Sequence, residues 1–146
     1  MAPIGATTSP TATDGARRAD VELRLPADNA YASVLRTTTA GLAARLDFPI
    51  DDIEDLRIAV GEASAMVLGQ AMPGTDLLCR FYQGDGELTI GITGTVDTIS
   101  GVVGPDKDSF AWQVLTTLAT DATAEAVDST FSITLTMVSS RQEPGL

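Results

Sequence analysis

The sequence predicts an α+β fold, a two-layer sandwich in which a mixed, mostly antiparallel sheet is covered on one face by three helices. Residues 51–68 have the spacing of a long amphipathic helix, and two apolar runs flank a Gly-Asp-Gly turn at residues 84–86. The predicted elements follow the order strand, helix, helix, hairpin, helix, strand. This order favours one sheet with its helices on one side.

We expect the domain to form around the helix at residues 51–68. Its apolar residues recur at spacings of three and four, so they share one helix face that packs against a core. We expect Asp51 to cap this helix, because a carboxylate can accept hydrogen bonds from the free N–H groups of the first turn. The residues of the buried face are Ile53, Leu56, Val60, Ala63 and Val67.

The elements before this helix are a strand and a first helix. Apolar and charged residues alternate over residues 21–25, which is typical of a half-buried strand, and Pro26 ends it. Asp28 is expected to cap a helix that ends near Leu46.

The second half of the chain supplies a hairpin, a helix and a last strand. Two short runs rich in apolar and β-branched residues flank the Asp-Gly turn, which favours a hairpin. Polar residues rich in Gly, Pro and Asp then indicate a long loop. The expected ranges are strands over 77–82 and 87–93, a loop over 94–108, a helix over 109–120 and a strand over 131–137.

A length of 146 residues favours a single domain. Residues 1–20 contain mostly Ala, Thr, Pro, Gly and Ser, so we expect a disordered tail. We place the domain at residues 21–138 and expect a frayed tail at 139–146.

The composition is that of a globular protein, with 44% apolar and 20% charged residues. No apolar run has the length of a membrane span, and the N-terminus lacks the pattern of a signal peptide, so we expect a cytoplasmic protein. The lone cysteine, Cys79, fits a reducing compartment, and we expect it to be a small core residue.

The charge pattern restricts the function. A formal net charge of −11 disfavours binding to nucleic acid and to anionic membranes. It suits a basic protein partner, although it also serves solubility alone. The absence of histidine excludes Ser-His and Cys-His nucleophiles and histidine metal sites.

Residues 56–68, LRIAVGEASAMVL, resemble the N-box helix of the RsbW-type anti-sigma factors of the GHKL ATP-binding superfamily. The family pattern is Leu-x-x-Ala-Val-x-Glu-Ala-x-x-Asn. From periodicity alone, an ordinary core helix with a solvated acidic edge is the alternative. The chain matches the pattern at Leu56, Ala59, Val60, Glu62 and Ala63, and departs from it at Met66.

With the order of elements, the resemblance covers residues 21–138 and implies a GHKL-like (Bergerat-like) domain. Residues 108–122, DSFAWQVLTTLATDA, look most like the divergent actinobacterial anti-sigma factors of the UsfX and UshX kind. The implied function is that of an anti-sigma factor, which sequesters an RNA polymerase sigma factor and is released by an anti-anti-sigma (STAS-type) protein.

The resemblance also locates a nucleotide pocket, whose first box is altered. In GHKL kinases the N-box Glu orients or deprotonates the attacking group, and the Asn four residues later binds magnesium. Glu62 could still act as a base. Met66 cannot replace the Asn, since a thioether is a poor magnesium ligand.

The second and third boxes are altered as well. No Asp precedes Gly94 to bind adenine; Asp97 could replace it, although a solvated loop carboxylate is the alternative. The glycine-rich lid is replaced by residues 108–112, where we expect Phe110 and Trp112 to be packing residues rather than an adenine platform.

The resemblance therefore implies a degenerate cofactor pocket of Glu62, Met66, Asp97, Phe110 and Trp112, partly closed by Met66 and the two aromatic residues. We expect no metal site, weak or no binding of ATP with magnesium, and no kinase activity. One rival hypothesis is a serine-protein kinase that phosphorylates its antagonist with Mg-ATP and uses Glu62 as base. The other is a module that binds a different small ligand.

In the family, the sigma factor docks near the first helix, where the homodimer also forms. The resemblance thus implies a partner surface near that helix and the acidic edge at residues 47–55. The alternative is that this face packs within the monomer. The expected partner residues are Arg36, Thr37, Thr38, Ala40 and Arg45.

Overall fold

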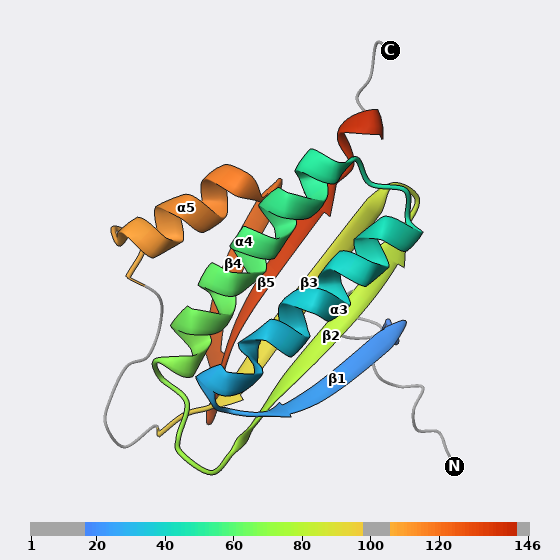
Figure 1. The fold of residues 1–146 in the computed structure, drawn as a ribbon. Helices are drawn as coiled ribbons and strands as arrows, with labels where there is room; N and C mark the ends of the chain where they lie inside the picture. Colours follow the sequence, from blue (N-terminus) through green and yellow to red (C-terminus); the bar gives the residue numbers. More distant parts are fainter. Residues whose placement is uncertain (1–16, 98–105, 143–146) are drawn as a thin grey trace.

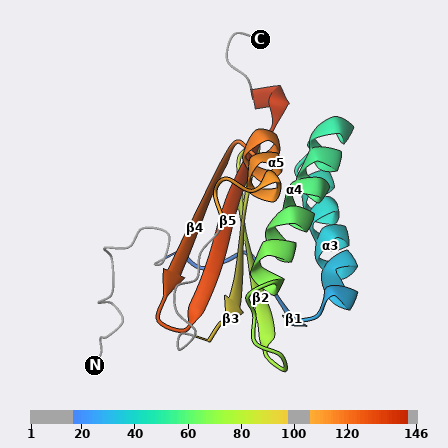
Figure 2. The same ribbon diagram turned by 90° about the vertical axis from the view of Figure 1, so that its left-hand side faces the viewer.

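The computed structural model describes residues 17–97 and 106–142. Its helices lie together on one face of a twisted sheet, and the other face of the sheet carries no helix in the described ranges (Figures 1 and 2). This arrangement confirms the predicted α+β sandwich. Within those ranges, no helix combines the length and the apolar character needed to cross a bilayer.

The helices follow the predicted order: η2 (Asn29–Tyr31), α3 (Ala32–Arg45), α4 (Ile50–Leu68) and α5 (Phe110–Leu118). Asp28 is a cap, as expected, but of η2: its Oδ1 accepts a hydrogen bond from the Ala30 N–H at 2.8 Å. The expectation that Asp51 caps α4 is wrong. The helix starts at Ile50, directly after Pro49, so Asp51 lies inside the first turn. There the positive end of the helix dipole still stabilises its negative charge.

The sheet has the strand order β1-β2-β3-β5-β4. All four pairings are antiparallel, so the sheet of the described residues is not the mixed one that we expected. The strands are β1 (Val21–Pro26), β2 (Asp76–Gly84), β3 (Glu87–Thr95), β4 (Asp121–Val127) and β5 (Thr130–Val138).

Strand β4 is absent from the predicted elements. Its sequence, DATAEAV, contains alanine and acidic residues, which are depleted in strands. The turn to β5 also lacks glycine; Asp128 instead adopts a positive φ of 52°. The alternating alanines at 122, 124 and 126 were the available signal, because they share one face of a strand.

The core lies between the helices and the sheet. The entire predicted stripe of α4 is buried, and the facing sheet residues include Phe81, Ile90, Ile92, Ile133 and Leu135. Cys79 is buried in β2, which confirms its predicted place in the core, and burial raises the pKa of its thiol to about 11.

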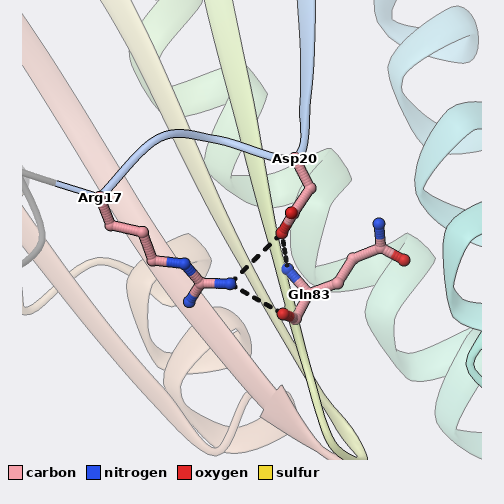
Figure 3. A network of polar contacts seen from close by, with 3 residues as sticks. All are labelled: Arg17, Asp20 and Gln83. Atoms are coloured by element: carbon pink, nitrogen blue, oxygen red, sulfur yellow. Dashed lines mark hydrogen bonds and ion pairs between the residues drawn. The ribbon is translucent and has the colours of Figure 1, made fainter.

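Described residues within both expected tails contact the domain. Arg17 donates to the Gln83 carbonyl oxygen at 2.8 Å, and Asp20 accepts from the Gln83 N–H at 2.7 Å (Figure 3). At the other end, the Ser140 N–H donates to Asp52 at 2.8 Å. Residues 17–20 and 139–142 thus contact the domain, while residues 1–16, 98–105 and 143–146 lie outside the described part.

At Gly94 the sheet comes close to α4. A Cβ atom placed on Gly94 would lie 2.8 Å from Cγ1 of Val67, and 3.4 Å from Cδ2 of Leu77. Val67 is fully buried and β-branched, so its methyl group has little freedom to move. A side chain at position 94 would therefore push α4 off the sheet.

We predict that Gly94→Ala lowers the free energy of unfolding by about 1–3 kcal/mol, the usual cost of overpacking a core. The control is Gly41→Ala in α3, where a Cβ meets no atom within 4 Å. That change should stabilise the protein by about 0.5–1 kcal/mol, because alanine favours a helix. Urea denaturation of both variants measures the difference; an unchanged Gly94→Ala variant would contradict the close approach.

Candidate functional site

The N-box positions lie on the outer flank of α4. Glu62 and Met66 are half-buried, and Met66 packs against the core. They are one helical turn apart, so their side chains are neighbours on the helix surface. The structure thus gives Glu62 an apolar neighbour where an oxygen ligand would be needed beside it.

Glu62 also borders a hollow of about 410 Å³ between α3 and α4. Its wall on α3 is Arg36, whose Cδ lies 3.6 Å from the position that a Cβ on Gly61 would occupy. Gly61 therefore leaves room for the arginine stem to cross from α3 to α4. The residues of this α3–α4 hollow are Arg36, Glu54, Arg57, Ile58, Gly61 and Glu62.

The start of α5 lies where the resemblance implies a glycine-rich lid. Ser109 caps the helix, since its Oγ accepts a hydrogen bond from the Trp112 N–H at 3.1 Å. Just before it, Asp106 Oδ1 accepts from the Asp108 N–H at 3.0 Å. The Lys107 Nζ lies 5.8 Å from the centroid of the Trp112 ring. The segment before α5 thus carries two exposed carboxylates and one lysine that sits over an aromatic ring.

The two aromatic residues of this segment have different surroundings. Trp112 is 8% exposed and belongs to the core, as expected of a packing residue. Phe110 is 80% exposed, so the expectation that it packs and closes the pocket is wrong for the described residues. Phe110 is the first residue of α5, and it is not among the buried residues of that helix, which are Trp112 and Leu115.

Asp97 is exposed and follows Val96, which pairs with Ala71 at the end of β3. Of the five residues in the expected pocket, Met66 and Trp112 pack against the same core, while Glu62 borders the α3–α4 hollow. The described residues do not form a polar pocket from all five.

The residues of the expected pocket do not fit magnesium and a nucleoside triphosphate. Among the described residues, no group of three or more His, Cys, Asp or Glu side chains has the geometry to hold a metal ion. A hard cation needs several oxygen ligands, and Met66 offers a thioether next to Glu62. A triphosphate bound beside the start of α5 would meet the like charges of Asp106 and Asp108, which are both exposed.

The expected partner residues divide between two sides of α3. Arg36 lies against α4, and Ala40 packs against the core. The Thr38 hydroxyl donates to the Val34 carbonyl oxygen at 2.9 Å. Thr37 and Arg45 are exposed. Because α3 separates these groups, the five residues form no single patch. Of the five, Arg36 is the one that lines the hollow between α3 and α4.

A second hollow, which the sequence analysis missed, lies on the open face of the sheet. Its floor is made of small and hydroxylated residues, with the Thr93 and Ser132 hydroxyls 2.8 Å apart. Arg80 and Tyr82 line one side and Glu125 the other. The alternation of hydroxylated residues in β3 and β5 was the available signal, since these residues share one face of the sheet. The floor residues are Thr89, Gly91, Thr93, Ser132 and Thr134.

The chain is similar to proteins named serine-protein kinase RsbW. It is 31% identical to the one from Bacillus velezensis over 90 residues, which are 62% of this chain and 51% of that protein. It is 33% identical to that of Bacillus subtilis over 92 residues, with the same coverage of 62% and 51%. No protein-family model matches the chain.

A solved structure, that of the RsbU and RsbW domains of a Mycobacterium tuberculosis protein, shares the fold. The TM-score is 0.60 at 18% identity, over 82% of this chain and 31% of that one. The chain spans about half the length of the curated relatives described above. It is therefore RsbW-like in sequence over its matched part and in fold.

We predict that Ser109→Ala destabilises the protein by about 1 kcal/mol, because an N-cap hydroxyl satisfies an otherwise free N–H group. The matched control is Thr117→Ala, since the Thr117 hydroxyl donates only to the Gln113 carbonyl oxygen of its own helix. That change should stay within about 0.5 kcal/mol of the native value. Thermal unfolding followed by Trp112 fluorescence measures both; equal losses would contradict the capping role.

Proposed function

We propose that this protein is an anti-sigma factor that binds an RNA polymerase sigma factor and is released by an anti-anti-sigma protein. The observation that carries the proposal is which motif residues α4 keeps and which it has lost. This helix keeps the residues of the RsbW-like motif that face the core, together with Glu62, while position 66 carries a methionine. The residues that face the core are thus retained, while the position that would hold the magnesium ligand is altered.

The rival function is the one named in the relatives, serine-protein kinase. Phosphoryl transfer depends on positioning and on neutralising the phosphate charge. Met66 beside Glu62 and the acids before α5 supply neither, so we propose that the protein is not a kinase and binds Mg-ATP weakly or not at all. Glu62 is then a surface carboxylate of the hollow rather than a base.

We place the sigma-binding surface on the α3–α4 hollow. It presents two arginines and two glutamates around Ile58, whose side chain is 49% exposed on the outer face of α4. An apolar centre with charged residues around it is typical of a protein interface. The net charge of −11 adds a long-range attraction for a basic partner.

Without phosphorylation, the release of the sigma factor depends on competition between the sigma factor and the antagonist for the anti-sigma factor. An antagonist that binds the anti-sigma factor lowers its free concentration and so frees the sigma factor by mass action. We further propose that the protein is cytoplasmic, forms a homodimer and binds no nucleic acid. We also propose that it belongs with the actinobacterial UsfX-like group of GHKL-type anti-sigma factors.

We predict that the purified protein forms a complex with one sigma factor from a panel of recombinant sigma factors of its host, seen by size-exclusion chromatography at low and moderate salt. Ile58→Glu together with Arg36→Glu should weaken the complex at least about tenfold, by placing acids in the centre and wall of the surface. The control is Arg141→Glu, which reverses an exposed arginine in η4. No complex with any sigma factor would contradict the proposal.

A further inference from the structure

The face of the sheet that points away from the helices carries the second hollow described above, which we call the open-face hollow (Figure 2). Its volume is about 460 Å³. Sites for small molecules usually have about 300–1,000 Å³. Its lining includes no residue of α3, α4 or α5, so it is separate from both the altered nucleotide boxes and the α3–α4 hollow.

Gly91 forms a depression in the floor of the open-face hollow. The strand register places Arg80 of β2 directly opposite Gly91 on one side, and Thr134 of β5 on the other. A Cβ atom on Gly91 would meet only the Thr134 Oγ1 atom, at 3.6 Å, so packing does not require a glycine here. A glycine inside a strand often marks a place where another group approaches the backbone closely.

Two pairs of hydroxyl groups border this depression along the strands. The Thr89 and Thr136 hydroxyls lie 2.9 Å apart, and those of Thr93 and Ser132 lie 2.8 Å apart. Each pair links β3 to β5 by a hydrogen bond between side chains. The hydroxyls on both sides of Gly91 therefore satisfy each other and hold the floor in one arrangement.

Two further hydroxyls remain available between these pairs. Thr134 lies directly opposite Thr123 of β4, and both residues line the hollow. Among the described residues, neither hydroxyl has a hydrogen-bond partner. A hydroxyl group both donates and accepts hydrogen bonds, so these two can bind a ligand through either function.

The charges around the hollow disfavour an anion. Arg80 donates through Nε to Glu22 at 3.1 Å, and Arg17 forms an ion pair with Asp20 at 3.3 Å. Both arginines of the hollow thus have an acid beside them, which offsets their charge. On the opposite side, Glu125 is exposed and has no basic partner within the described ranges. An anionic ligand would meet this free carboxylate.

A cation fits no better, because the guanidinium groups of Arg17 and Arg80 line the same hollow as the carboxylates of Glu87 and Glu125. A neutral molecule with several hydroxyl groups matches all of the available partners. Its hydroxyls can accept from the Nη atoms of Arg80, donate to Glu125, and do both with a threonine hydroxyl.

We propose that the open-face hollow binds a neutral polyhydroxylated molecule of the sugar class above Gly91. The inference goes beyond the proposed function, since the site lies on the layer of the fold that carries no helix in the described ranges. Binding of the sugar and binding of a sigma factor are therefore separate properties, and each can be measured without the other.

The test titrates the full chain with glucose, glucosamine and glucose 6-phosphate, which share one scaffold and differ in charge. Amide shifts in two-dimensional NMR spectra report both the affinity and the place of binding. Glucose should shift the amides of Gly91 and Thr134 until they saturate, with a dissociation constant of about 10 mM or tighter. Glucose 6-phosphate should bind at least about tenfold more weakly, because its phosphate meets Glu125. Glucosamine should bind no more tightly than glucose.

Two variants examine the site itself. Gly91→Val fills the depression and should weaken glucose binding at least about tenfold; it should remain folded, since valine favours strands and the added Cβ meets no atom closer than 3.6 Å. Thr134→Val removes one available hydroxyl and should weaken binding about three- to tenfold, the usual effect of one hydrogen bond. The matched control is Thr95→Val, on the same face of β3 but outside the hollow, which should leave the affinity unchanged.

Glucose shifts that do not saturate, or that lie away from β3 and β5, would overturn the site. An unchanged affinity of Gly91→Val would do the same. Tighter binding of glucosamine or of glucose 6-phosphate than of glucose would overturn the neutral class of ligand. If glucose does not bind but a sigma factor does, only this inference fails; the reverse result contradicts the proposed function alone.

Discussion

The structure depends on the packing of α4 against the centre of the sheet. One face of this helix is buried along its length, and at Gly94 the two layers come so close that a methyl group has no room. Interiors of this density tolerate few changes of volume, so the inner face of α4 is fixed by packing. The other helices then take their places on either side of α4, as Figure 1 shows.

The flank of the same helix is less tightly enclosed, and there the chain departs from the motif that it resembles. Glu62 and Met66 are both half-buried; Glu62 keeps the motif, whereas Met66 departs from it and packs against the core. The start of α5 likewise combines residues that stabilise the fold with residues exposed to solvent. Ser109 and Trp112 hold the helix in place, whereas the preceding acids face solvent. A fold can therefore keep its core while residues outside the core change.

Sequence reasoning predicted the elements with strong apolar periodicity, including the whole buried face of α4. It missed β4, whose alanines bury little area and whose turn has no glycine. Phe110 was misplaced because an aromatic residue at a helix start predicts burial by type, while its exposure depends on where the neighbouring chain runs. Likewise, no spacing in the sequence could indicate that Arg36 crosses over Gly61, since that contact joins two helices.

In the proposed function, this RsbW-like frame binds Mg-ATP weakly or not at all. Calorimetric titration of the protein with Mg-ATP tests it most directly, with a serine-protein kinase of the RsbW kind as the positive control. We expect no saturable heat at ATP concentrations below about 1 mM, which corresponds to a binding free energy weaker than about 4 kcal/mol. A micromolar dissociation constant, or transfer of labelled phosphate to an anti-anti-sigma protein, would contradict the claim.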